Sequence, residues 1–217
     1  MTSVEAMLLA EELALIALDP DSGRHAVGTR DNLNACLAGL LVAELQLEDR
    51  PPAAILDAAN EVVDEAGPKL KRALSAMSRG LERRLGAGTW DAVIGGLVDA
   101  GVVAPAEGSL RPSHRVLDPA SREAIVERLR AAAASDEPME VRTAVLLSMT
   151  GPAQLLELVA PDRAARKHAR KRIDHALDAS AMGPVAASVR KVIAEAAAAA
   201  AAAGTAAAVG AATSSSS

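Results

Sequence analysis

The stretch from Asn32 to Leu47 constrains the fold of this chain more than any other. Leucine, alanine, valine and one cysteine occupy nearly every side of a helix drawn through it, and Glu44 is its single charge. A helix that is apolar all round is normally buried inside a domain. The stretch is also shorter than a membrane span, which needs about 20 apolar residues. We therefore expect a central buried helix in one soluble domain, with Thr29 or Asp31 as its cap.

Composition limits the partners of such a domain. Half of the 217 residues are apolar, which is enough for one sizeable core, yet the chain has one Trp and neither Phe nor Tyr. Binding of unpaired bases relies on aromatic side chains, and the net charge of −5 also disfavours nucleic acid as a partner. Cys36 is the only cysteine, so we expect no disulfide, a reducing compartment and a cytoplasmic location. No secretory signal is recognisable.

The periodicity along the chain predicts a mainly α fold: a single compact helical domain around the buried central helix, with short peripheral β-hairpins. We expect this domain at residues 1–185, and at 186–217 an Ala-rich helix that frays into a disordered Ser tail. Expected helices are Ser3–Leu18, Lys69–Leu85, Trp90–Ala100, Pro119–Ala134, Met139–Thr150, Ala153–Ala160, Asp162–Ala179 and a segment from Val185 onward.

Caps and turns support several of these boundaries. Thr2 with Glu5 has the spacing of a capping box, and Thr89 and Asp118 precede later helices. Val102–Val103 and Arg115–Leu117 flank a turn-rich stretch that predicts a hairpin. Residues 51–66 are ambiguous, because they fit either a helix by propensity or two short strands around Ala59-Asn60.

Five stretches in order give the chain a recognisable pattern. The stretches are MLLAEELALIALDPDSGR (Met7–Arg24), LAGLLVAELQL (Leu37–Leu47), GLVDAGVV (Gly96–Val103), LDPASREAIVERLRA (Leu117–Ala131) and VRTAVLLSM (Val141–Met149). With these stretches the chain resembles the Golgi phosphoprotein 3 family, including its bacterial members, over nearly the whole length to about Ala179.

The resemblance implies a compact, mainly helical domain with no catalytic role. In the eukaryotic members of the family this domain binds phosphatidylinositol 4-phosphate in a basic pocket, beside a hairpin that contacts the membrane or another protomer. The resemblance also favours two strands at Ile55–Val63, and we adopt that expectation. The pocket positions of the family, a Trp and three Arg, align with Thr29, Ala38, Ala87 and Trp90, and none keeps its type. Arg30, Arg83 and Arg84 lie near those positions and are candidates for a shifted headgroup pocket.

The strongest charge pattern lies between Asp162 and His175. Lysines and arginines recur there at helical spacing along one face, which we call the basic stripe: Arg163, Arg166, Lys167, Arg170 and Lys171. Ala165, Ala169, Ile173 and Ala176 lie toward the other side of the helix. Such a stripe can attract anionic lipid, although a solvated face paired with acidic neighbours has the same pattern.

Three further side chains are candidates for headgroup contact. Trp90 could cover a headgroup, although a lone Trp more often anchors packing. Arg111 and Arg115 flank the hairpin and could grip phosphate oxygens, or simply keep the hairpin soluble. Leu110 is alone near the tip, so deep insertion of the hairpin into a membrane is not expected. The hairpin could instead contact a protein partner or a second copy of the chain.

Enzyme chemistry finds little basis in the sequence, and we expect no catalysis, metal or cofactor. The four histidines lack metal-ligand spacing, and no phosphate loop or nucleophile elbow is present. Two other readings stay open. One is a protein-interaction scaffold without a lipid pocket. The other is a winged-helix DNA-binding module, but its recognition helix would be Trp90–Ala100, which lacks Lys, Arg, Asn and Gln.

Overall fold

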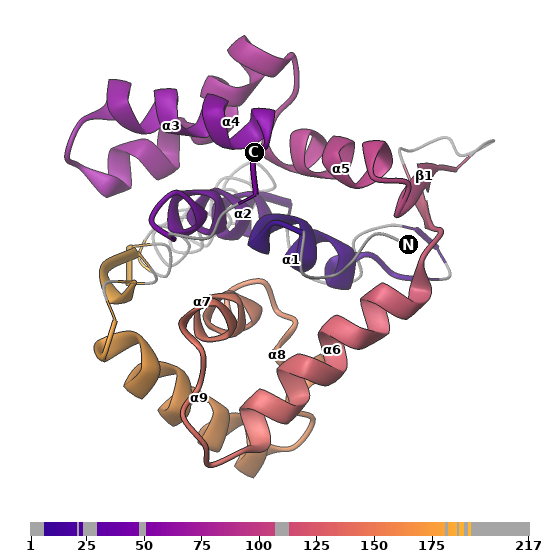
Figure 1. The fold of residues 1–217 in the computed structure, drawn as a ribbon, viewed down its shortest axis with the longest axis vertical. Coiled ribbons are helices and arrows are strands. Elements are labelled where there is room, and N and C mark those ends of the chain that lie inside the picture. The colour runs from indigo at the N-terminus through magenta and orange to yellow at the C-terminus, as the bar shows by residue number, and fades with distance from the viewer. Residues whose placement is uncertain are drawn as a thin grey trace, which may run out of the picture.

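Two buried helices, α1 (Leu9–Ala17) and α2 (Arg30–Glu44), occupy the middle of the fold, between α3, α4 and α5 on one side and α6 to α9 on the other (Figure 1). A computed structural model describes residues 7–20, 22–23, 30–47, 51–106, 113–180, 182–185, 187–188 and 191. The structure is mainly helical with a small two-stranded antiparallel sheet, as the sequence predicted.

The predicted central helix is confirmed as α2. Its leucines and Cys36 have almost no exposed surface, and α2 contacts α1, α3, α4, α5 and α7. Burial raises the pKa of the Cys36 thiol to about 12. The helix ends at Glu44, and the next three residues form a turn in which the Leu47 N–H donates to the Glu44 carbonyl (3.1 Å).

The strands expected at Ile55–Val63 are wrong, because this segment is part of a helix, α3 (Ala54–Ala66). Ile55, Ala59, Val62 and Ala66 are all buried, at the three- and four-residue spacing of one helical face. This face packs on α4 (Leu70–Leu85), where Gly80 leaves room for the Val62 side chain. A pair of strands would have divided these apolar residues between two faces.

The helix α5 (Thr89–Asp99) leads into the predicted hairpin. Thr89 was expected to be the cap, but Gly88 occupies that position and Thr89 is the first helical residue. Gly101 adopts the expected left-handed conformation with φ of 71°. The strands β1 (Val103–Pro105) and β2 (His114–Val116) pair antiparallel, with Val103 opposite Val116.

A backbone hydrogen bond joins the base of the hairpin to the segment after α1. The His114 N–H donates to the Gly23 carbonyl at 2.7 Å. Gly23 has φ of 64°, and a side chain there would overlap the backbone of His114. Glycine is therefore required at this close approach.

The other side of the core consists of α6 (Pro119–Ala134), α7 (Val141–Thr150), α8 (Leu156–Val159) and α9 (Arg163–Asp178). Asp118 caps α6 as predicted, accepting from the Ser121 N–H at 3.0 Å, and Asp162 caps α9 in the same way. At the carboxyl end of α7, the Gln154 N–H donates to the Gly151 carbonyl and the Leu155 N–H donates to the Thr150 carbonyl. Gln154 itself has φ of 62°. A left-handed residue closing a helix end is usually Gly, so Gln is unusual at this position.

Four charged side chains connect α1, α2, α6 and α7 within the core. Glu44 accepts hydrogen bonds from the Leu9 N–H (2.8 Å) and from Arg142 (2.5 Å), and Glu12 pairs with Arg128. Both carboxylates are fully buried. Burial raises the pKa of Glu12 to about 7, although Arg128 and Arg142 partly oppose this rise.

Several expectations lie outside the described residues. The described part of the first helix starts at Leu9, so the predicted start at Ser3 and the Thr2–Glu5 capping box are not covered. The same holds for Thr29 and for most of the chain after Val185.

Candidate membrane-binding surface

The basic stripe lies on α9, with its opposite face fixed in the core. Ala169, Ile173 and Leu177 are buried and pack against the rest of the domain, which determines the outward direction of the other side of the helix. The exposed members of the stripe are Arg163, Lys167, Arg170 and Lys171. Arg166 is half-buried and donates to the Pro161 carbonyl (2.7 Å) and to Glu157 (3.3 Å). The helix thus presents four outward cations and one that is partly neutralised.

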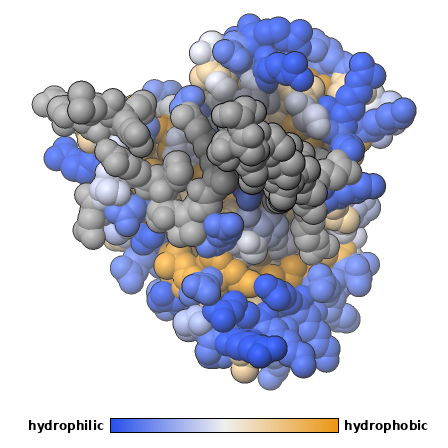
Figure 2. Space-filling model, turned by 180° about the vertical axis from the view of Figure 1, so that it is seen from behind, coloured by the Kyte–Doolittle hydropathy of each residue, from blue (hydrophilic) through white to orange (hydrophobic). Residues whose placement is uncertain are grey.

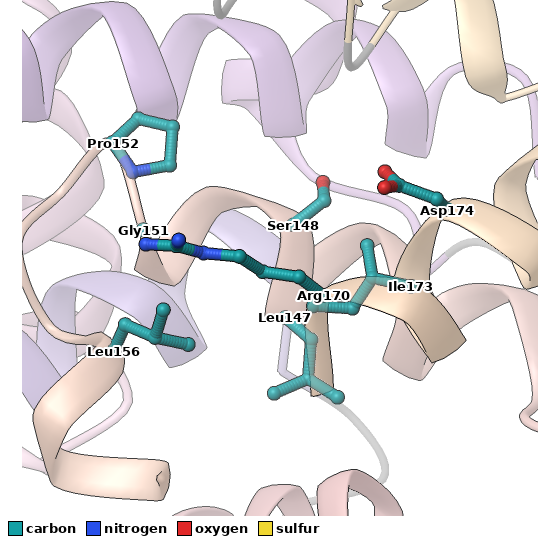
Figure 3. A pocket seen from close by; sticks show the side chains of 8 residues that line it. All are labelled: Leu147, Ser148, Gly151, Pro152, Leu156, Arg170, Ile173 and Asp174. Atoms are coloured by element: carbon teal, nitrogen blue, oxygen red, sulfur yellow. The ribbon is translucent and has the colours of Figure 1, made fainter. Parts of the chain in front are cut away.

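A cleft of about 280 Å³ opens beside the stripe, between the carboxyl end of α7, α8 and α9 (Figure 3). Leu147, Leu156 and Ile173 contribute apolar walls, and the Arg170 side chain extends across the opening toward Gly151. Sequence reasoning assigned Arg170 to the stripe but missed the cleft. The walls of the cleft come from three segments that are separate in the sequence, so no local motif could have predicted the cleft.

Arg83 and Arg84 lie at the carboxyl end of α4 and contact the acidic helix α3. Arg84 donates to Glu61 (2.7 Å) and pairs with Glu65, which raises the pKa of its guanidinium. Arg83 also pairs with Glu65 (3.4 Å). Their charges are therefore balanced across the α3–α4 contact.

The hairpin carries one described candidate, Arg115. It is exposed on β2 opposite Ala104, and Arg111 lies outside the described residues. The neighbouring His114 is partly buried, which lowers the pKa of its imidazole, although Asp91 opposes this. The hairpin and α9 lie at opposite corners of the fold (Figure 1), so the structure does not bring Arg115 and the basic stripe together.

The described residues show few features of other functional classes. No group of three or more His, Cys, Asp or Glu residues suited to a metal ion occurs within them. None of the helices they form is long and apolar enough to cross a membrane. The proposed recognition helix of a winged-helix module, α5, has Trp90, Val93, Ile94 and Leu97 buried against its neighbours. Its exposed charged positions are Asp91 and Asp99, and their negative charge disfavours insertion into a DNA groove.

Comparison with known families identifies the fold. A family model described as Golgi phosphoprotein 3 (GPP34) matches residues 9–196. The chain belongs to the Golgi phosphoprotein 3 family. The resemblance predicted from the five sequence stretches is thereby confirmed. A search of curated proteins gave no significant match.

In this Golgi phosphoprotein 3 member, α2 and α5 meet where the resemblance locates the headgroup pocket. The Trp90 N–H donates to the Asn34 side-chain oxygen at 3.0 Å, and the Trp90 side chain is only 6% exposed. Ala38 is buried and Ala87 is half-buried. Arg30 begins α2, but its side chain is not described. The buried position of Trp90 favours a packing role over contact with a headgroup.

Proposed function

We propose that this protein binds anionic membrane surfaces peripherally and reversibly through the exposed basic face of α9, and that it catalyses no reaction. One observation carries the proposal: α9 directs four cations outward while its other face is locked into the core. Arg163, Lys167 and Arg170 have no ion pair or hydrogen bond with another described residue. Their charge is therefore available to a negatively charged partner.

The expected affinity is modest. Each basic residue close to an anionic bilayer contributes about 1 kcal/mol, so four residues supply roughly 4 kcal/mol. Exposed charges are screened beyond about 8 Å at physiological ionic strength. Binding should therefore weaken steeply as salt is added.

The headgroup preference that we propose is phosphatidylinositol 4-phosphate or a similar phosphoinositide. Membership of the Golgi phosphoprotein 3 family supports it. A phosphomonoester also carries more negative charge than a simple phosphodiester, which favours it on a basic surface. Charge on α9 would supply most of the attraction, because the positions that align with the pocket of the family hold no Arg in this chain.

Liposome co-sedimentation tests the proposal. Neutral vesicles, vesicles with phosphatidylglycerol and vesicles with phosphatidylinositol 4-phosphate would be compared at low and high salt. The double variant Arg163→Glu/Lys167→Glu should abolish pelleting with anionic vesicles. The matched control is Arg72→Glu/Arg79→Glu, which makes the same charge change at exposed positions of α4 and should pellet nearly as well as the parent.

The possible results separate three functions. Pelleting only with the phosphoinositide would support a specific headgroup preference. Equal loss in both double variants would mean that net charge alone drives adsorption, which contradicts a role for α9. No pelleting of the parent at low salt would refute membrane binding and favour a protein-interaction scaffold.

A further inference from the structure

We propose that the cleft between α7, α8 and α9 binds the phosphate and polyol of one phospholipid headgroup, with Arg170 holding the phosphate. This inference rests on the proposed function and deepens it, because it names a site for a single lipid beside the surface that attracts the bilayer. The cleft is defined above by its apolar walls and by the arginine that extends across its opening (Figure 3).

Arg170 differs from Arg166 and Arg172 of α9 in having no acceptor among the described residues. Arg166 donates to the Pro161 carbonyl, and Arg172 donates to the Glu137 carbonyl at 2.6 Å. Arg170 forms no hydrogen bond or ion pair with the part of the chain that the structure describes. Its planar guanidinium can therefore bind phosphate oxygens through two parallel bonds.

The guanidinium is not needed to close α7, although it points toward Gly151 at that helix end. Three carbonyls there already accept from backbone donors: Ala153 N–H bonds to Met149, Leu155 N–H bonds to Thr150 and Gln154 N–H bonds to Gly151, at 2.7 to 3.0 Å. Because these bonds close the end of the helix without Arg170, its donors can bind an external acceptor.

The rest of the cleft fits the other parts of a phospholipid headgroup. Ser148 and Asp174 lie together at the end away from the Arg170 guanidinium (Figure 3). The Ser148 hydroxyl donates to the Val145 carbonyl (2.7 Å) and can accept a hydrogen bond from a polyol hydroxyl. Leu147, Leu156 and Ile173 form walls for the first carbons of the lipid. The volume of about 280 Å³ is at the small end for ligand sites, so it suits a headgroup and not a whole lipid.

The molecule also exposes apolar surface beside hydrophilic surface. Seen from behind, a hydrophobic band crosses the lower half of the molecule, and hydrophilic residues border it below (Figure 2). An apolar surface next to cations is the arrangement expected of a protein that contacts the boundary between headgroups and acyl chains.

The test uses a soluble lipid, so that binding in the cleft is separated from adsorption to a bilayer. Dihexanoyl phosphatidylglycerol, below its critical micelle concentration, is titrated into the full chain and followed by ¹H–¹⁵N spectra. We expect saturable one-to-one binding that shifts the amides of Ser148, Gly151 and Leu156. Glycerol 3-phosphate and dihexanoyl phosphatidylcholine should bind at least about tenfold more weakly, since one lacks the acyl carbons and the other lacks the polyol and a net charge.

Two matched variants complete the test. Arg170→Gln should weaken binding of dihexanoyl phosphatidylglycerol about tenfold, the effect of losing one charge-assisted contact. Arg72→Gln removes the same charge from an exposed position of α4, outside both the cleft and the basic stripe, and should change the affinity less than twofold. Equal losses in the two variants, or shifts confined to other regions, would overturn the proposal. If vesicles pellet through α9 while the soluble lipid does not bind, the cleft is refuted and the proposed function stands. If vesicles do not pellet either, both are refuted.

Discussion

Burial of Glu12 predicts a stability that decreases as the solution becomes more alkaline. In the folded protein the pKa of Glu12 is about 7, compared with an ordinary value of 4.5. Folded Glu12 therefore retains a proton between these pH values while the unfolded chain has lost it. Folding takes up a proton in this range, so the free energy of unfolding falls as the pH rises from 4.5 to 7 and is constant above it. The magnitude is roughly 3 kcal/mol, since one pH unit corresponds to about 1.36 kcal/mol.

The variant Glu12→Gln isolates this effect, because Gln is neutral at every pH. Urea unfolding would be followed at pH 5, 6, 7 and 8 by circular dichroism and by fluorescence of Trp90, with coincident curves indicating a two-state transition. We expect the variant to match the parent near pH 5 and to be more stable by roughly 3 kcal/mol at pH 8. Burial lowers the pKa of His114, which makes the free energy of unfolding rise with pH and so opposes the effect of Glu12. Because both proteins contain His114, its contribution cancels when their stabilities are subtracted.

Glu127→Gln on α6 is the matched control. Glu127 is 59% exposed and pairs with Arg130 at the surface (2.5 Å), so its removal should shift stability by less than about 0.5 kcal/mol at each pH. Parallel profiles for the parent and Glu12→Gln would refute the reasoning. They would mean that Arg128 and Arg142 compensate fully for the burial of Glu12.

Four other perturbations test the packing, a helix cap and the burial of Cys36. Gly80→Ala should destabilise by about 1–3 kcal/mol in urea unfolding, because the added methyl would overlap Val62. Gly95→Ala, which meets no atom within 4 Å in α5, should instead stabilise by about 0.5–1 kcal/mol, and similar losses in both would contradict this. Asp118→Ala should cost about 1 kcal/mol by the same measurement, through loss of the α6 cap, and an unchanged urea midpoint would argue against it. Cys36 should resist a thiol reagent at pH 8 until urea unfolds the chain, and rapid reaction of the folded protein would contradict its burial.

Local signals in the sequence were sufficient for many elements. Asp118-Pro119 gave the start of α6, and the Gly101 signal gave the end of α5, because caps and left-handed turns depend on one or two residues. The prediction of strands at Ile55–Val63 is wrong: the apolar pairs there fit either two strands or a helix, and the family resemblance favoured strands. The fit of α3 against α4 at Gly80 decides between them, and that contact joins residues distant in the sequence.

The candidate site divides in the same way. The spacing of the basic stripe follows from helix periodicity, so its exposed face on α9 could be predicted. The half-buried state of Arg166 could not, because it depends on Glu157 and Pro161 from the preceding segment. Likewise, Glu44 looked like an interruption in an apolar helix. Its partner Arg142 lies 98 residues away, and only the tertiary fold joins them.

The bond between His114 and Gly23 has a mechanical consequence for the hairpin. A hairpin attached to the domain only through its two ends could change its orientation relative to the domain. Here its base is also hydrogen-bonded to Gly23, in the chain segment that follows the buried helix α1. Tension applied to the hairpin would therefore be transmitted to α1 and to the ionic contacts that Glu12 makes there. The base of the hairpin is therefore held against the segment after α1, and a partner that binds this base would also fix the orientation of α1.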